Sequence, residues 1–478
     1  MNSYKTVLFT TIAAALALPA CGDSQDPVDV PESYAFSSRF ASDASSVSYS
    51  GQVFRQVLIA ELVGYMDQIT DQITAGTLTP DAGDITGALK VYYDFDDAAS
   101  GTRALTLSAD PSLLQSSYDD ISSGKNLRDK IAGNDEVGQH RDWAAEFTGW
   151  SEGGAASPDA LIQYWFGLLD GLAVDRAAGT IPNDPDGEAI TLVYITAKGQ
   201  DLKQLIQKFL LGAVNLSQGL DDYLDNDTDG KGLRSSNLRD GDKSYSTLEH
   251  QWDEGFGYFG AARDYNDYTD DEIAGKGGRE GYKKGYHDSN GDNAIDLLSE
   301  YNFGHSTNAA KRDRGSSAQA PTDFTKTIFD AFLTGRAIIS SADGELDDDQ
   351  IADLVEQRDI IAREWEAVVA ATVVHYINET LVDMGTFGGS YNFVDHAKHW
   401  SELKGFALGL QFSRFSPLTE AQFAQLHQLI GDAPVLPNAP SADIEAYRQD
   451  LLMARDIVGQ GYDFDPANLG DQNGENGW

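Results

Sequence analysis

Apolar residues recur at helical spacing along most of the chain. The clearest helical segments are residues 50–76, 201–224 and 347–385. The first begins at Ser50, a potential N-cap, and the second follows Asp201, another capping residue type. The third is long enough for one extended helix or for two joined helices. Because strand candidates such as residues 189–197 are short and isolated, the pattern predicts an all-α fold with long loops.

Three blocks of sequence recur in the same order. The paired blocks are LLDGLA (168–173) with FLTGRA (332–337), the apolar helix 201–224 with residues 363–384, and HQWDEGFGYFG (250–260) with HWSELKGFALG (399–409). The last pair aligns Trp252 with Trp400 and Glu254 with Glu402. Chance similarity between amphipathic helices is the alternative. We interpret the repeat as two related helical-bundle lobes, packed about a pseudo-twofold axis.

This repeat, together with the N-terminal pattern, divides the chain. The expected parts are a signal peptide (1–20), a tether (21–33), a first helical lobe (34–320) with an acidic insertion (225–300), and a second helical lobe (321–478). The tether has two prolines and no apolar period, which is typical of a linker. The insertion gives the first lobe its long acidic loops.

The first 21 residues indicate export and lipidation. After one lysine comes an uncharged apolar run of about 15 residues, the length of a signal core and too short to span a bilayer. The run ends in Leu-Pro-Ala-Cys, which resembles the lipobox of bacterial lipoproteins and makes Cys21 the lipidated residue. An ordinary signal peptide with an incidental cysteine is the alternative. Since Gly22 follows the cysteine, we predict a lipid anchor in the cell envelope, at the outer membrane of a Gram-negative bacterium.

Charge and cysteine content exclude several classes of function. The chain has 76 acidic and 34 basic residues, a net charge of -42, and one cysteine. Such a surface repels nucleic acids, so we expect no nucleic-acid partner. A single cysteine permits no intrachain disulfide and no thiolate zinc site in the mature protein. The membrane is reached through the lipid anchor alone, and an outer-membrane transporter or another surface protein is the expected partner.

Two acidic loops have the residue types of calcium sites. The first contains Asp225, Asp227 and Asp229, and the second contains Asp288, Asn290, Asp292 and Asp296. Oxygen ligands at alternate positions of a short loop can converge on Ca²⁺. Both loops are incomplete EF-hand matches, because Ser236 and Ser299 stand where a bidentate glutamate is usual. We predict calcium more strongly at the second loop, with solvated loops as the alternative.

The stretch HAKHWSELKGF places metal-ligand side chains three residues apart. His396, His399 and Glu402 would lie along one flank of a helix and could share iron or zinc. His250 and Glu254 on the matching helix are the expected partners if the lobes face each other.

The alternative for the same stretch is a packing helix. Trp400 and Phe406 would then point inward, while the histidines would meet solvent or a neighbouring carboxylate. We further expect His375, within an apolar helix, to be a hydrogen-bonded core residue.

The His-x-x-Glu stretch resembles the signature of the imelysin family, helical bacterial envelope proteins linked to iron and to metallopeptidase activity. The family's usual form is Gly-x-His-x-x-Glu, and Ala397 replaces that glycine here. More of the chain is similar to an uncharacterised family of bacterial lipoproteins defined by a domain of unknown function. The blocks that carry this likeness are SVSYSGQVFRQ (46–56), NLRDKIAG (126–133), EHQWDEGFGYFGAARDY (249–265) and HWSELKGFALGLQFSRF (399–415). The resemblance implies an imelysin-like helical fold.

Three functions from different classes follow. The first is an outer-membrane-anchored lipoprotein that binds or relays a metal, in iron acquisition. The second is an imelysin-like metallopeptidase, which needs an open metal position and a general base; the helical zinc-peptidase signature His-Glu-x-x-His is absent from the sequence. The third is a non-enzymatic surface lipoprotein that binds a partner protein. We rank them in that order and leave open whether the protein is an enzyme.

Overall fold

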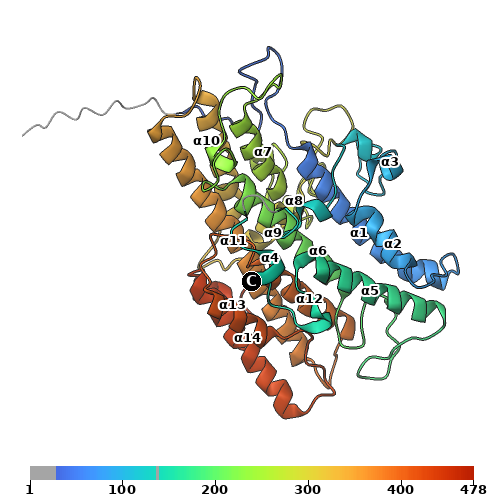
Figure 1. The fold of residues 1–478 in the computed structure, drawn as a ribbon. Coiled ribbons are helices and arrows are strands. Elements are labelled where there is room, and N and C mark those ends of the chain that lie inside the picture. The colour runs from blue at the N-terminus through green and yellow to red at the C-terminus, as the bar shows by residue number, and fades with distance from the viewer. Residues whose placement is uncertain (1–27, 136–138) are drawn as a thin grey trace, which may run out of the picture.

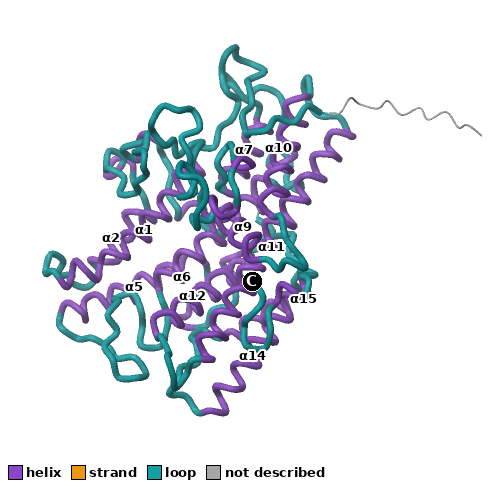
Figure 2. Tube along the Cα trace, turned by 180° about the vertical axis from the view of Figure 1, so that it is seen from behind, coloured by secondary structure: helices purple, strands orange, loops and turns teal. Residues whose placement is uncertain are grey.

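The computed structural model describes residues 28–135 and 139–478, and within these ranges the protein consists of helices and loops. Fifteen α-helices and no strands are found in the described residues. Pairing of the β type is limited there to isolated bridges. Two of these bridges, Asn183 with Ala189 and Ile195 with Asp201, involve the segment predicted as a strand candidate. Figure 2 shows helices joined by long loops, without a sheet. The all-α prediction is confirmed.

The helices have the following bounds. The α-helices are α1 (Ser50–Thr74), α2 (Asp84–Tyr93), α3 (Asp97–Ser100), α4 (Trp143–Glu146), α5 (Pro158–Ala177), α6 (Leu202–Leu210), α7 (Thr247–Phe259), α8 (Asp270–Ile273), α9 (Gly304–Gly315), α10 (Phe324–Ser341), α11 (Asp348–Gly385), α12 (Phe393–Gly409), α13 (Glu420–Ile430), α14 (Ser441–Gly461) and α15 (Pro466–Leu469). Short 3-10 turns are η1 (Tyr118–Asp120), η2 (Arg128–Lys130), η3 (Glu152–Gly154), η6 (Gly232–Arg234) and η7 (Tyr265–Asp267), and two π-helical segments are η4 (Leu211–Leu216) and η5 (Gly219–Tyr223).

The predicted helix starts are close to the observed ones. Ser50 is the first residue of α1 rather than its cap, since Tyr49 precedes the helix without a side-chain hydrogen bond. Asp201 does cap α6, because its carboxylate accepts a hydrogen bond from the backbone N–H of Gln204 at 3.0 Å. Asp347 caps α11 in a capping box with Gln350. The segment predicted at 347–385 is one helix of 38 residues, Asp348–Gly385, rather than two helices.

The predicted helix 201–224 is not uniform. Beyond α6 the chain winds into the π-helical segments η4 and η5, in which every residue is buried. Such widened turns are rare and occur often at functional sites. At Gly219 a β-carbon would lie 2.5 Å from the indole ring of Trp365 on α11. The tight packing of η5 against α11 therefore requires glycine at this position.

The long helix α11 lies at the centre of the molecule. Helices α9, α10, α12 and α14 all pack against it, and its residues Trp365, Val369 and Val373 are 1% exposed or less. Figure 1 shows α7 and α10 beside one end of α11, with α13 and α14 at the other end of the molecule. One hydrophobic cluster connects side chains from both halves of the chain.

Helices α6 and α12 cross at very short range. A β-carbon added at Gly212, just after α6, would lie 2.6 Å from the Cα of Gly409. One at Gly405 would lie 2.6 Å from the Cβ of Lys208 on α6. The two backbones meet here because glycine leaves no side chain between them.

The repeated blocks in α7 and α12 share a buried tryptophan, but the division into lobes stays a prediction. Trp252 in α7 and Trp400 in α12 are both fully buried. Their indole N–H groups donate to the carbonyl of Phe332 at 3.0 Å and to the hydroxyl of Tyr447 at 2.9 Å. Since α12 packs on α6 as well as on α11, contacts cross the predicted boundary at residue 320.

The N-terminal predictions fall mainly outside the described residues. The signal peptide, Cys21 and most of the tether belong to residues 1–27, and the described chain begins at residue 28. In the part that the structure describes, none of the helices combines the length and hydropathy that crossing a bilayer requires.

Candidate ligand-binding site

The helix α12 carries the predicted His-x-x-His-x-x-Glu stretch. It begins after Asn392, whose side-chain oxygen accepts from the backbone N–H groups of Val394 and Asp395. The stretch is helical throughout, as predicted, so His396 and His399 are one turn apart, as are His399 and Glu402. Their surroundings nevertheless differ.

His396 is enclosed away from any cavity described for the protein. It is 0% exposed, its Nδ1 lies 3.0 Å from the hydroxyl of Tyr391, and the ring of Phe387 packs at 5.5 Å. Desolvation, followed by the charge of His399, lowers the pKa of His396 to about 3. This imidazole is therefore neutral at physiological pH and belongs to the packing of the segment before α12.

His399 is half-buried and tied to a carboxylate of α11. Its Nδ1 lies 2.8 Å from Oδ2 of Asp383. Desolvation is the largest influence on its pKa and lowers it, but the hydrogen bond and the charge of Asp383 act together in the opposite direction and leave the pKa of His399 raised. The ring is held by Nδ1, which leaves Nε2 for other contacts.

Glu402 is buried, with 4% of its surface exposed. Its Oε1 lies 3.2 Å from Nζ of Lys208 on α6, whereas Oε2 has no hydrogen-bond partner within the described residues. Tyr376 of α11 lies beside it, and burial, followed by the charge of Glu402, keeps the pKa of that phenol well above its usual value. Unpartnered buried carboxylate oxygens are uncommon and mark a position for attention.

His399 and Glu402 line a cavity of about 790 Å³, which we call the α9–α12 cavity. Its walls come from α9, α11, α12 and the C-terminal segment 474–478, with Lys276 from the loop after α8. The charged and aromatic lining residues are Lys276, Lys311, Arg312, Arg314, His375, Tyr376, Glu379, Lys398, His399, Glu402, Glu475 and Trp478. The predicted motif therefore places two of its three side chains in one cavity.

The C-terminal residue closes one side of the α9–α12 cavity. Trp478 is 4% exposed, its indole N–H donates to the carbonyl of Arg312 at 3.0 Å, and its carbonyl accepts from the side chain of Asn378 at 2.9 Å. His375 hydrogen-bonds to the backbone of Trp478, and its pKa is held well below the usual value by burial and then by Arg312. His375 is hydrogen-bonded, as expected, and it is half-buried in this wall, where it lines the cavity.

On α7, the helix that the sequence repeat pairs with α12, the predicted metal ligands His250 and Glu254 lie outside the α9–α12 cavity. Nδ1 of His250 lies 2.9 Å from the carbonyl of Ser48, and its ring stacks on Tyr245. Glu254 accepts from the side chain of Gln52 at 2.8 Å and lies 3.8 Å from His250. Neither lines the α9–α12 cavity, so the structure brings His399 and Glu402 together without His396, His250 or Glu254.

Comparison with known proteins gives one family. Residues 111–276 match a family model described as Domain of unknown function (DUF4856). This confirms the predicted likeness to a family defined by a domain of unknown function, whereas the imelysin likeness stays a prediction. Neither the curated proteins nor the solved structures give a match to the chain.

The DUF4856 segment contains α7 and the first acidic loop, while α12 and the second acidic loop lie outside it. In the first loop, the carboxylates of Asp225 and Asp227 form ion pairs with Arg414, and Asp229 pairs with Arg234. These predicted calcium ligands are thus engaged by arginines that the sequence pattern did not indicate.

The second acidic loop is closed by its own hydrogen bonds. Asp288 accepts from the N–H groups of Gly291 at 2.8 Å and Asn293 at 2.9 Å, and Asn290 and Asp292 each accept from an N–H two residues later. Asp296 accepts from the side chain of Gln115 at 2.7 Å. Asn293 has φ +65°, the left-handed conformation for which glycine is usual at that loop position.

Metal binding at these loops and at α12 stays a prediction. Over residues 28–135 and 139–478 there is no group of three or more His, Cys, Asp or Glu side chains arranged to hold a metal ion.

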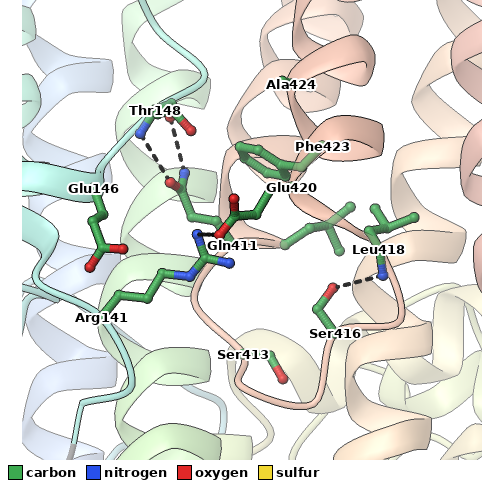
Figure 3. Close-up of a pocket in the computed structure, with 11 residues that line it drawn as sticks. Arg141, Glu146, Thr148, Gln411, Ser413, Ser416, Leu418, Glu420, Phe423 and Ala424 are labelled. Carbon is green, nitrogen blue, oxygen red and sulfur yellow. Dashed lines mark hydrogen bonds and ion pairs between the residues drawn. The ribbon is translucent and has the colours of Figure 1, made fainter.

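A second pocket of about 360 Å³ lies between the loop after α4, the loop after α12, and α13. Figure 3 shows the guanidinium of Arg141 meeting the carboxylate of Glu420. Nη1 of Arg141 lies 3.4 Å from Oε1 of Glu420. Gln411 holds the backbone of Thr148 by two hydrogen bonds of 3.2 and 3.3 Å. The guanidinium of Arg141 is thus paired within this pocket. Four of the five Lys and Arg residues that line the α9–α12 cavity form no ion pair within the described residues.

Sequence reasoning missed the basic side chains of the α9–α12 cavity. Lys311, Arg312 and Arg314 come from the run KRDR, which is unusual in so acidic a chain, and Lys398 lies inside the motif stretch itself. A search for basic clusters would have found both segments, although only the fold shows that α9 and α12 share a cavity.

Proposed function

We propose that this protein is a ligand-binding lipoprotein of the bacterial cell envelope, and that its ligand occupies the α9–α12 cavity. The observation that carries the proposal is that His399 and Glu402, two of the three motif residues predicted to bind a metal, both line this cavity. Its volume of about 790 Å³ lies within the range of small-molecule sites. The lipid anchor of this proposal is inferred from the Leu-Pro-Ala-Cys stretch. The partner that would receive the ligand is an outer-membrane transporter or another surface protein.

A binding function requires fewer groups in the α9–α12 cavity than a catalytic function does. A metallopeptidase needs a metal with an open coordination position and a general base. In the α9–α12 cavity the two motif side chains are instead held by neighbours, His399 by Asp383 and Glu402 by Lys208. Such contacts fix the positions of the side chains, which favours recognition of a ligand by preformed groups.

Filling the cavity tests this function without knowledge of the ligand. Val382 on α11 lines the cavity and is 38% exposed, so a Val382→Trp variant is expected to fold and to occupy the space. Met453→Trp on α14 is a matched control, since Met453 is 45% exposed and lies outside the cavity. We expect compounds from a mixed panel of neutral, cationic and anionic small molecules to raise the melting temperature of the wild type and of the control, but not of Val382→Trp. Equal shifts in all three proteins would contradict the proposal.

Metal relay is a second candidate, favoured by the presence of His399 and Glu402 in the same cavity. We expect the chain from residue 21 onward, purified without chelators, to retain a transition metal that a His399→Ala/Glu402→Ala variant loses, as measured by elemental analysis. His250→Ala/Glu254→Ala is the matched control, with the same residue types on α7. Loss in both variants would show that the loss is not specific to α12, and equal metal content in all three proteins would remove α12 from metal binding. Calcium bound equally by all three would point to the acidic loops instead.

A further inference from the structure

Positive charge without a partner collects in the α9–α12 cavity. Five of its lining residues are Lys or Arg and three are Glu. Arg314 forms an ion pair with Asp271, but Lys276, Lys311, Arg312 and Lys398 form none within the described residues. Acidic residues outnumber basic ones 76 to 34 in the chain, so most positions would offer a carboxylate nearby. Four cations without an ion pair around one cavity are therefore unexpected, and they attract a negatively charged ligand.

Arg312 gives the strongest indication. It is 6% exposed, and its Nε and Nη1 atoms are buried without a hydrogen-bond partner among the described residues. Burial lowers the pKa of Arg312 to about 10. A buried guanidinium with unmet donors is unfavourable unless a charged acceptor approaches it, and its planar fork suits a carboxylate or a phosphate.

Lys311 adds a second charge beside it. Its side chain is exposed and lines the α9–α12 cavity. The other cations of the lining are Lys276, Arg312, Arg314 and Lys398. Desolvation, followed by the charges of Lys208 and Arg312, lowers the pKa of Lys311 to about 8. An anion in the cavity would relieve the repulsion between these neighbouring cations.

The cations come from two separate walls. Lys311 and Arg312 belong to α9, whereas Lys398 belongs to α12, and both helices pack against α11. A ligand that meets both walls needs an anionic group for each of them.

We propose that the α9–α12 cavity binds a small molecule with at least two anionic groups, carboxylate or phosphate, one held by Lys311 and Arg312 and another by Lys398. This inference rests on the proposed function, because it names the ligand class of the same cavity. The remaining lining groups, including Tyr376 and Glu402, supply hydrogen-bonding positions for the uncharged part of the ligand.

Calorimetric titration of the chain from residue 21 onward tests the ligand class. The probes are citrate for multiple carboxylates, pyrophosphate for linked phosphates, and acetate for a single carboxylate. We expect citrate or pyrophosphate to bind at least tenfold more tightly than acetate, and the affinity to fall as the salt concentration rises. The tighter of the two probes identifies the anionic group.

Two single variants locate the binding. Lys311→Ala and Lys398→Ala are each expected to weaken citrate or pyrophosphate at least tenfold, while Lys243→Ala, which removes an exposed cation outside the cavity, leaves the affinity unchanged. Unfolding midpoints of all variants verify that they are folded. Equal affinity in the wild type and in both cavity variants would overturn the inference, as would acetate binding as tightly as citrate.

The two proposals fail in different ways. If neutral or cationic compounds bind in a manner that Val382→Trp abolishes, while citrate and pyrophosphate do not bind, the ligand class is wrong and the binding function stands. If compounds of no charge class bind in a manner sensitive to Val382→Trp, the binding function itself is wrong.

Discussion

Replacement of Arg336 by methionine is expected to lower the free energy of unfolding by about 3–5 kcal/mol, among the largest effects of any single substitution in this chain. Arg336 on α10 is 0% exposed, and its guanidinium lies 3.0 Å from Glu249 and 2.9 Å from Asp253, both on α7 and both fully buried. Methionine would leave Asp253 without a counter-ion in a low-dielectric interior. Glu249 would lose one of its two cations and keep its pair with Arg39 at 3.3 Å. The hydroxyl of Tyr34, which donates to Asp253 at 2.8 Å, cannot neutralise a charge.

Urea unfolding followed by circular dichroism measures this loss. Arg363→Met is the matched control, because the side chain of Arg363 on α11 is 67% exposed and, among the residues that the structure describes, pairs only with its neighbour Glu364. We expect the control to change stability by less than about 1 kcal/mol, as is usual for surface ion pairs. A loss below about 1 kcal/mol for Arg336→Met would show that Asp253 is protonated or hydrated in the folded protein.

Truncation of Trp400 to alanine is expected to cost a similar amount, about 3–5 kcal/mol, through the cavity left behind. The indole is fully buried and donates to the hydroxyl of Tyr447 on α14, so the substitution also removes a hydrogen bond between two helices. His399→Ala, one residue earlier, removes a half-buried ring and its contact with Asp383, and we expect a loss of about 1 kcal/mol or less. Comparison of the two variants separates the stability that α12 gains from its buried tryptophan from the stability that it gains from His399.

The same denaturant titration compares these variants. If His399→Ala lowers the free energy of unfolding as much as Trp400→Ala does, His399 stabilises the fold, and its position in the cavity is no evidence of ligand binding. If neither costs more than about 1 kcal/mol, α12 is held mainly by its glycine contacts with α6.

The helices of this fold were predictable where local signals agree. Asp347 and Gln350 form a capping box ahead of a continuous helical pattern, so α11 begins where the sequence places it. The π-helical form of residues 211–223 was not predictable, because it accompanies close packing around Gly219 and Trp365, which are far apart in the chain. Local spacing indicates a helix there but cannot show how its hydrogen bonds shift.

The site was predictable in its residue types and not in its surroundings. The spacing of His399 and Glu402 indicates one face of α12, and both line the cavity. Whether a ring three residues earlier joins them depends on Tyr391, which engages His396 on the other side. The engagement of Asp225 by Arg414 is likewise a tertiary contact that no loop pattern shows.

The close crossing of α6 and α12 also sets the electrostatics of the α9–α12 cavity. Lys208 reaches Glu402 at 3.2 Å because Gly405 lets α6 approach without an intervening side chain. A methyl group at position 405 would separate the helices, lengthen that ion pair and weaken the compensation of the Glu402 charge by Lys208. The distance between α6 and α12 thus affects the net charge of the cavity wall. A substitution that contacts no ligand can therefore change whether the cavity binds anions or cations more tightly.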